Sequence, residues 1–491
     1  MAKKARCIMV QGTMSGAGKS LLCAALCRIF AQDGLRAAPF KSQNMALNSA
    51  VTKDGLEMGR AQYMQAEAAG IEPDVRMNPV LLKPCSDTGS QVIVNGEIRA
   101  QMSAKEYFAY KKQLIPEILA AYESLAAEND VIVIEGAGSP AEINLRQDDI
   151  VNMGLAELVD APVLLAGDID RGGVFAQLYG TAALLAPRER QRVKGLIINK
   201  FRGDVGLLQP GLAQLEQLTG IPVAGVVPML KVDVDDEDSL APGLQGRSGC
   251  GAVDIAVVRL PHISNFTDFA PLATHPALSV RYVEAPAQLG EPDLVILPGT
   301  KSTTADLLWL RESGLEAAIL RLAGLEVPVL GVCGGYQMMG KTLHDPHGYE
   351  GDTPEVRGMD LLDCKTVFTA DKTRTRKSGR VLAGLLQGAE MTGYEIHQGR
   401  TVVNGSPFLQ FDSGEYDGCV SGRCAGTYLH GLFDSDEALD TLAEGLCRAK
   451  GIEPQARAMP RAEWRQSQYD LLADGVRKAL DMQRIYKILE G

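Results

Sequence analysis

The chain has 491 residues, too many for a single hydrophobic core, so at least two domains are expected. Its net charge of −12 argues against binding to nucleic acid, and no apolar run approaches the roughly 20 residues of a membrane-spanning helix. Ten scattered cysteines without a C-x-x-C pair predict reduced thiols and a cytoplasmic protein. The sequence is compatible with a homo-oligomer.

The first predicted elements are a strand at residues 7–10, a glycine-rich turn at 11–18 and a helix that ends near Gln32. This order is typical of a phosphate-binding P-loop, whose backbone N–H groups surround phosphate oxygens. The strict pattern has Gly where this chain has Thr13, so an ordinary glycine-rich turn is the alternative. The candidate ATP-binding residues here are Gly12, Thr13, Gly16, Gly18, Lys19 and Ser20, and the Ser20 hydroxyl is also a candidate Mg²⁺ ligand.

A second strand is predicted at residues 36–40, and Lys41 follows it. Ligands bind at the carboxyl ends of strands in open α/β sheets, so Lys41 could hold a phosphate or a substrate carboxylate. A solvated loop lysine is the alternative. The pattern then predicts a helix near 57–69, a proline-marked turn at 78–84 and a long helix at 104–127.

The apolar strand at residues 131–134 ends at Glu135. A carboxylate at the tip of a strand beside the P-loop strand is where a magnesium–nucleotide site needs one, so Glu135 is the second candidate metal ligand. A solvated strand-end acid is the alternative. Further along, Arg146 is a candidate to clamp a substrate carboxylate and Asp149 to orient an incoming amine.

Strands at residues 163–166, 196–198 and 222–227 complete an alternating pattern that predicts a doubly wound α/β domain over residues 1–230. In GTP-binding proteins the last residue of an N-K-x-D motif reads guanine, but that position here is Arg202. The nucleotide is therefore expected to be ATP, with Asn199 beside it. The acidic stretch that follows predicts a linker over residues 231–252, with a metal site as the alternative.

A second α/β pattern predicts strands at residues 253–258, 278–283, 294–297 and 327–332, within a domain over residues 253–450. Cys333 follows the last of these strands on a glycine-rich turn into a helix, as in a nucleophile elbow. The N–H of Gly334 and an N–H of the Gly299 loop are candidates for an oxyanion hole. A buried core thiol is the alternative for Cys333.

A cysteine nucleophile needs a base, and the chain has six histidines. His430 follows a short apolar segment late in the second domain and is the preferred candidate, with His397 as the competitor. Residues 451–491 have apolar positions at helical spacing and predict a C-terminal helical segment that packs on the sheet of a domain.

Both candidate sites together resemble the cobyric acid synthase family of glutamine-dependent amidotransferases. The P-loop is similar to that of dethiobiotin synthetases, which accounts for Thr13, and the elbow at residues 331–337 (GVCGGYQ) is similar to that of class I glutamine amidotransferases. Other stretches that resemble the family are 41–45 (KSQNM), 135–140 (EGAGSP), 149–154 (DIVNMG), 261–268 (PHISNFTD) and 394–397 (YEIH).

The resemblance implies an enzyme that uses ATP, Mg²⁺ and glutamine to amidate the b, d, e and g carboxylates of a corrinoid polycarboxylate, adenosylcobyrinic acid a,c-diamide. Most class I triads have Glu two residues after the histidine, where this chain has Leu432. The resemblance therefore implies that Cys333 and His430 act as a dyad. Two alternatives remain: a cobyrinic acid a,c-diamide synthase, and a P-loop switch ATPase with a degenerate glutaminase-like domain.

Overall fold

The computed structural model describes residues 5–84, 89–144, 146–234, 247–249, 251–350 and 353–491. They form two compact units. Unit 1 consists of Met1–Ala46, Glu57–Asp235 and Trp464–Gly491, and unit 2 consists of Leu47–Leu56 and Asp236–Glu463. These units differ from the predicted ranges in two places, because residues 47–56 belong to unit 2 and residues 464–491 to unit 1. Most of the predicted linker lies outside the described residues.

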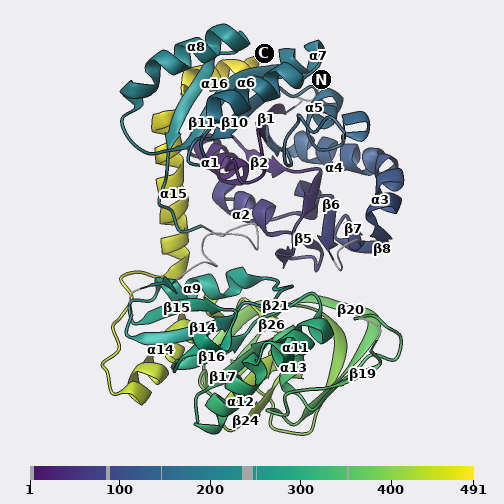
Figure 1. Cartoon of the computed structure of the whole chain (residues 1–491), viewed down its shortest axis with the longest axis vertical. Coiled ribbons are helices and arrows are strands. Elements are labelled where there is room, and N and C mark those ends of the chain that lie inside the picture. Colours follow the sequence, from purple (N-terminus) through teal and green to yellow (C-terminus); the bar gives the residue numbers. More distant parts are fainter. Residues whose placement is uncertain (1–4, 85–88, 145, 235–246, 250, 351–352) are drawn as a thin grey trace. The chain divides into compact units, whose positions relative to one another are not determined.

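Unit 1 is built on a six-stranded parallel sheet, as predicted (Figure 1). Its strands are apolar and almost fully buried, as expected for a parallel sheet covered on both faces. In spatial order they are β12 (Val223–Pro228), β11 (Val193–Phe201), β10 (Val163–Asp168), β1 (Arg6–Gly12), β9 (Val131–Glu135) and β2 (Ala37–Phe40).

Helices cover both faces of this sheet, which confirms the doubly wound arrangement. The helices whose side chains join the core of one face are α1 (Lys19–Gln32), α2 (Arg60–Ala69), α15 (Arg461–Ala479) and α16 (Met482–Glu490). Those on the other face are α4 (Ile115–Glu128), α5 (Met153–Val159), α6 (Val174–Leu184) and α8 (Gln209–Thr219). The C-terminal helices thus complete the core of unit 1, where Leu472, Val476 and Ile485 are at most 1% exposed.

A second, four-stranded sheet of unit 1 was not predicted. Its spatial order is β3 (Gln43–Met45), β6 (Val80–Pro84), β7 (Gly89–Val94) and β8 (Glu97–Ser103). The predicted turn at residues 78–84 is wrong, because the prolines lie just before β6 and at its end, where they interrupt little of the strand. The predicted helix over 104–127 is divided into α3 (Ala104–Tyr110), a 3₁₀ turn and α4, which has a proline in its first turn.

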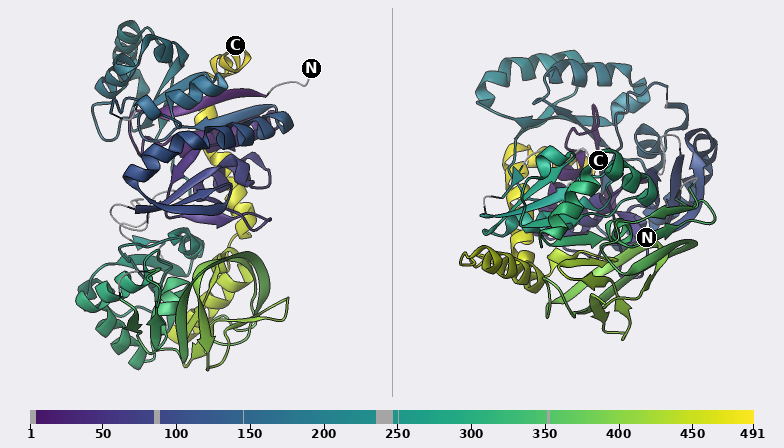
Figure 2. Two further views of the ribbon diagram at one scale, coloured as in Figure 1. Left: turned by 90° about the vertical axis from the view of Figure 1, so that its right-hand side faces the viewer. Right: turned by 60° about the horizontal axis from the view of Figure 1, so that its bottom comes forward.

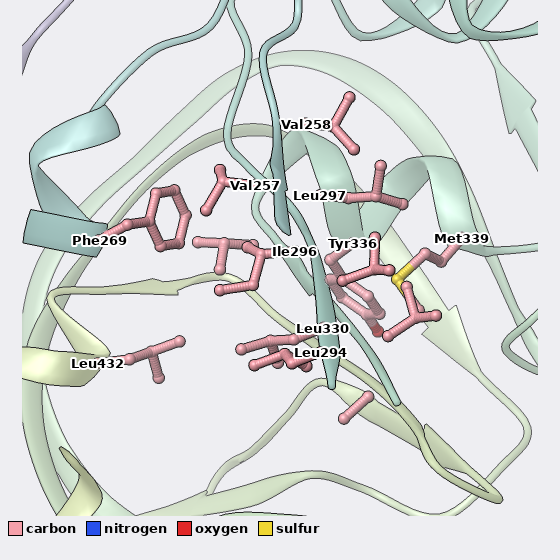
Figure 3. Close-up of a cluster of buried hydrophobic side chains, with 14 of the residues drawn as sticks. Val257, Val258, Phe269, Leu294, Ile296, Leu297, Leu330, Tyr336, Met339 and Leu432 are labelled. Carbon is pink, nitrogen blue, oxygen red and sulfur yellow. The ribbon is translucent and has the colours of Figure 1, made fainter. Parts of the chain in front are cut away.

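Unit 2 contains a seven-stranded sheet whose five central strands are parallel. The order is β13 (Arg247–Ser248), β15 (Leu278–Val283), β14 (Val253–Val258), β16 (Leu294–Leu297), β17 (Val329–Val332), β25 (Cys424–Thr427) and β24 (Cys419–Ser421). Its helices are α9 (Ala270–Thr274), α10 (Pro286–Leu289), α11 (Thr303–Glu312), α12 (Leu315–Gly324), α13 (Gly334–Met339) and α14 (Asp436–Lys450). The central strands supply much of the core, including Val257, Ile296 and Leu330 (Figure 3).

Another sheet of unit 2 is dominated by two long antiparallel strands, which curve strongly in the left view of Figure 2. Its members are β18 (Thr342–His344), β19 (Glu355–Arg357), β20 (Cys364–Val381), β21 (Glu390–Val403), β22 (Leu409–Phe411), β23 (Tyr416–Asp417) and β26 (Leu429–His430). This sheet was not predicted. Throughout the described ranges, no helix combines the length and the apolar character that a membrane crossing requires.

The contribution of α15 to unit 1 can be tested by truncating one buried side chain. Leu472→Ala is expected to destabilise the protein by about 2–5 kcal/mol, because it removes buried methyl groups and leaves a cavity. Leu472 is 1% exposed, whereas the neighbouring Leu471 is 54% exposed. Leu471→Ala is the matched control and should change stability by less than about 0.5 kcal/mol. Urea unfolding followed by circular dichroism measures both, and equal effects would contradict the packing of α15.

Candidate active sites

The P-loop of unit 1 connects β1 to α1 through a turn that requires glycine. Gly18 precedes the helix with φ +87°, and Gly16 has φ +74°. A Cβ at Gly18 would overlap the side-chain amide of Asn199, which donates a hydrogen bond of 2.9 Å to the Ala17 carbonyl. The structure therefore brings Asn199, at the end of β11, against the loop, although its contact with ATP stays a prediction.

Lys19 connects the P-loop to the loop that follows β9. Its side chain is buried, and Nζ donates to the carbonyl oxygens of Met14 at 3.2 Å and Gly138 at 3.3 Å. Gly12 is close to the same side chain, since a Cβ there would lie 3.2 Å from Lys19 Cδ and 3.0 Å from the Met14 oxygen. This close packing explains why glycine is present at position 12, one place before Thr13, where the P-loop departs from the strict pattern.

Glu135 is a fully buried carboxylate at the carboxyl end of β9. It accepts hydrogen bonds from Ser20 Oγ at 2.9 Å and from Lys41 Nζ at 2.8 Å. Gln62 and Gln65, on one face of α2, donate to its other oxygen at 3.2 and 2.6 Å. Ionised side chains are rarely buried without such partners, so this set compensates the charge.

The structure shows where two predicted features of this cluster lie. The predicted metal ligands Ser20 and Glu135 lie side by side, and Lys41 is 5% exposed, so the alternative of a solvated loop lysine is wrong. Gln62 and Gln65 were not predicted as site residues. Two glutamines three positions apart in an otherwise alanine-rich helix were the available signal, because that spacing puts both on one face.

The Ser20–Glu135 pair fits Mg²⁺, which prefers oxygen ligands and usually binds through one or two carboxylates together with substrate phosphates. Within the described ranges, no cluster of three or more His, Cys, Asp or Glu side chains could hold a metal ion. The Ser20 hydroxyl and the Glu135 carboxylate are the side chains that would hold this ion.

Arg146 and Asp149 line a cavity of about 420 Å³ in unit 1, but both have structural partners. Asp149 accepts backbone N–H bonds from Val151, Asn152 and Gly154 at 2.8–2.9 Å. Arg146 pairs with Glu189. Their roles toward substrate stay predictions. The same cavity is also lined by Gln43, Met45, Tyr107, Phe108, Lys111 and Ser139.

In unit 2, Cys333 stands between β17 and α13 in the geometry of a nucleophile elbow. Its φ of +52° and ψ of −109° are unusual for a residue with a side chain. A Cβ at Gly334 would lie 2.6 Å from Thr300 Cγ2, and one at Gly335 would overlap the Leu297 carbonyl. The elbow therefore lies directly against the loop of Gly299 and Thr300, which was the predicted source of the second oxyanion donor.

His430 is held by a carboxylate that the sequence analysis did not assign. His430 Nδ1 lies 2.6 Å from Asp268 Oδ2, and both side chains are buried. Asp268 belongs to a 3₁₀ turn (Phe266–Phe269), and the neighbouring Phe269 packs beside Val257 in the core (Figure 3). The geometry therefore contradicts a simple dyad, because a third side chain orients the imidazole. The available signal was the acidic residue at the end of the 261–268 motif.

The Asp268 carboxylate determines the charge of His430. Burial lowers the pKa of His430, but attraction and hydrogen bonding to Asp268, together with the Cys333 sulfur, raise it to about 10. Within the described residues, Nε2 has no hydrogen bond of ordinary geometry. A Cβ at Gly299 would lie 3.1 Å from His430 Cε1. Cys333, His430 and both candidate oxyanion glycines are thus close together.

His397, the competing base, has a different environment. Its ring stacks on Tyr428 with 3.6 Å between centroids, and its Nδ1 lies 3.2 Å from the Gly399 carbonyl oxygen. Burial lowers the pKa of His397 to about 3, so it is neutral at physiological pH. Unlike His430, it has no carboxylate partner among the contacts found in the described residues.

Comparisons with known proteins match each half of the chain to a domain family. Residues 8–239 match the model of a CobQ/CobB/MinD/ParA nucleotide binding domain, and residues 254–438 match that of a CobB/CobQ-like glutamine amidotransferase domain. The chain is 55% identical to a cobyric acid synthase of Ruminiclostridium cellulolyticum, over 99% of this chain and 97% of that protein. A cobyric acid synthase of Lachnoclostridium phytofermentans is 52% identical over 99% of both chains, and one of Citrobacter koseri is 53% identical over 98% of both.

The role of Asp268 can be tested by titrating the histidines. Asp268→Asn is expected to lower the pKa of His430 from about 10 toward the ordinary value near 6.5, because it removes the carboxylate that stabilises the imidazolium. Nitrogen-15 NMR of protein labelled at its six histidines measures this shift.

Asp440→Asn is the control for this titration, since Asp440 lies 3.6 Å from a different buried histidine, His275. It should leave the titration of His430 unchanged. An unaltered pKa of His430 in Asp268→Asn would contradict the assignment.

Proposed function

Since this chain belongs to the cobyric acid synthase family of glutamine-dependent amidating ligases, we propose that it amidates the b, d, e and g carboxylates of adenosylcobyrinic acid a,c-diamide to give adenosylcobyric acid. The observation that supports this most directly is the presence, in one chain, of a P-loop beside Glu135 and of a cysteine elbow beside His430. The first site activates a carboxylate, and the second supplies nitrogen.

In unit 1, the γ-phosphoryl group of ATP is transferred to a substrate carboxylate oxygen, which gives an acyl phosphate and ADP. Ammonia then attacks the acyl carbon, and phosphate leaves as the amide forms. Lys19 and the N–H groups of the P-loop stabilise the charge on the phosphoryl oxygens. Ser20 and Glu135 would hold Mg²⁺, which when bound neutralises part of the charge on the β- and γ-phosphates.

In unit 2, His430 accepts the proton of the Cys333 thiol, and Cys333 Sγ attacks the side-chain amide carbon of glutamine. The N–H of Gly334 and one from the Gly299 loop stabilise the developing oxyanion. His430, now protonated and stabilised in that form by Asp268, donates the proton to the departing nitrogen, and ammonia leaves a thioester on Cys333. His430 then accepts a proton from water, which hydrolyses the thioester to glutamate.

The corrinoid substrate is proposed to approach the cavity lined by Arg146 and Asp149 in unit 1. At about 420 Å³, this cavity is at the small end of typical ligand sites, so it would admit one edge of a corrin ring rather than the whole ring. The cavity lining holds two cations, Lys111 and Arg146, and two carboxylates, Glu142 and Asp149, and Arg146 pairs with Glu189, so Lys111 is the cation available to a substrate carboxylate.

The proposed reaction is tested with purified protein, ATP, Mg²⁺, glutamine and the a,c-diamide substrate. Mass spectrometry should detect four successive amidations, and each should require both ATP and glutamine. A preference for unamidated cobyrinic acid would instead indicate an a,c-diamide synthase, and absence of glutamine hydrolysis would favour the switch ATPase.

Cys333→Ser is expected to reduce glutamine-driven amidation by at least about a thousandfold, because the nucleophile is lost. Amidation driven by a high ammonium concentration should persist, since unit 1 is unchanged. Cys447→Ala, at another buried cysteine in α14, is the matched control and should retain both activities. Loss of both activities in Cys333→Ser would contradict the assignment of nitrogen release to unit 2.

Lys19→Ala is expected to stop amidation with either nitrogen source, because the γ-phosphoryl group loses its principal cation. Glutamine hydrolysis should continue at a measurable rate. Lys478→Ala, at an exposed lysine of α15, is the control and should leave synthesis unchanged. Sustained amidation by Lys19→Ala would show that the P-loop does not bind the reacting nucleotide.

A further inference from the structure

A short segment from the N-terminal half of the sequence belongs to unit 2. Residues Leu47–Leu56 are part of that compact unit and include β4 (Ser49–Val51). Ser49 and Val51 are each only 1% exposed. These residues are therefore buried, although about 180 residues of unit 1 separate the segment from the rest of unit 2 along the chain.

The backbone of Ser49 takes part in a closed set of three hydrogen bonds. Its N–H donates to Asn265 Oδ1 at 3.2 Å, and its carbonyl oxygen accepts from the Tyr394 hydroxyl at 3.3 Å. The Asn265 amide in turn donates to the Tyr394 hydroxyl oxygen at 3.1 Å. All three bonds are buried, where lost hydrogen bonds are costly to replace, so they fix Asn265 and Tyr394 relative to the segment.

Tyr394 is in direct contact with His430. The two rings stack with 5.2 Å between centroids and 14° between planes, and the two residues are paired across β21 and β26. The position of the imidazole therefore depends on the position of the tyrosine ring.

Asn265 begins the turn that carries Asp268. It adopts φ +51°, and its carbonyl oxygen accepts the N–H of Asp268 at 3.0 Å. Val51 provides a further contact, because it forms a small apolar cluster with Tyr394 and Ile396. The Ile396 carbonyl oxygen lies 3.7 Å from Cys333 Sγ, which donates to it. The segment thus touches one neighbour of each of Cys333, His430 and Asp268.

We propose that Leu47–Leu56 is a positioning segment of the glutamine-hydrolysing site, and that Tyr394 and Asn265 are its positioning residues. This inference rests on the function proposed for that site. The segment orients His430 through the Tyr394 ring and Asp268 through the Asn265 turn, so its effect is on the rate of amide cleavage rather than on the binding of glutamine. Ala46 alone separates the segment from Met45, which lines the cavity of unit 1, so one short peptide connects both sites covalently.

The test uses the full-length protein and measures two rates: glutamate release from glutamine, and amidation driven by ammonium. Tyr394→Phe keeps the stacked ring but removes the hydroxyl that bonds to Ser49. It is expected to lower kcat for glutamine about five- to tenfold, the size of effect that loss of buried hydrogen bonds produces. The KM for glutamine and the ammonium-driven rate should stay within about twofold of the parent.

Two further variants act on the other contacts of the segment. Val51→Ala reduces the packing on Tyr394 and Ile396, and Asn265→Gly removes the amide while glycine still permits the left-handed backbone. Both should show the same selective loss of kcat. The effects of Val51→Ala and Tyr394→Phe should be less than additive in the double variant, because both act through one ring. Tyr469→Phe removes the hydroxyl of a buried tyrosine, which donates a part-buried hydrogen bond to Glu67 in unit 1, and should leave glutamate release unchanged.

Parental kcat in Tyr394→Phe, Val51→Ala and Asn265→Gly would overturn the inference. Equal loss of the glutamine-driven and ammonium-driven rates would also overturn it, because that pattern reports general destabilisation. If the parent protein itself releases no glutamate from glutamine, the proposed function fails; if the parent does so and the variants match it, only the positioning role fails.

Discussion

Parallel strand pairing is the constraint on which both candidate sites depend. In unit 1, the pairing of β9, β1, β10 and β11 places Glu135, the P-loop and Asn199 at one edge of the sheet. In unit 2, the pairing of β16, β17 and β25 places the Gly299 loop and Cys333 at one edge of the sheet. The carboxyl ends of such strands are where α/β sheets bind ligands. Since strands are buried on both faces, a slip in register would separate these groups as well as disturb the core.

The two buried carboxylates of these sites are stabilised in different ways. Glu135 accepts bonds from a lysine, a hydroxyl and two amides, which compensates its charge before any metal or nucleotide binds. Asp268 instead forms a hydrogen bond of 2.6 Å with a single imidazole, that of His430. The first arrangement suits a site that must accept a cation and a polyphosphate. The second suits a site in which one proton has to move between a histidine and a leaving nitrogen.

Local patterns predicted the central strands of both sheets, the P-loop helix and the elbow, because each is encoded within about ten neighbouring residues. The groups that were missed depend on distant parts of the chain. Asp268 is 162 positions from His430, and the Tyr394–Ser49 bond spans 345 positions. Periodicity carries no information on such pairs. Asp149 has a structural contact that the sequence did not indicate: its carboxylate accepts backbone N–H bonds in the turn before α5, while its role toward substrate stays a prediction. The long strand pair β20–β21 was not predicted, because charged residues on its exposed face obscure the alternation of polar and apolar residues that marks a strand.

The packing of α15 and α16 on the sheet of unit 1 has a consequence for how the chain is made (Figure 1). The ribosome synthesises β1, α1 and α2 early, whereas α15 and α16, which complete the same face of the sheet, are synthesised last. The part of this face that α15 and α16 cover therefore stays exposed until the intervening polypeptide has been synthesised. During translation the nascent chain therefore exposes apolar surface that is prone to aggregation, and a premature stop codon before α15 would leave this surface exposed permanently.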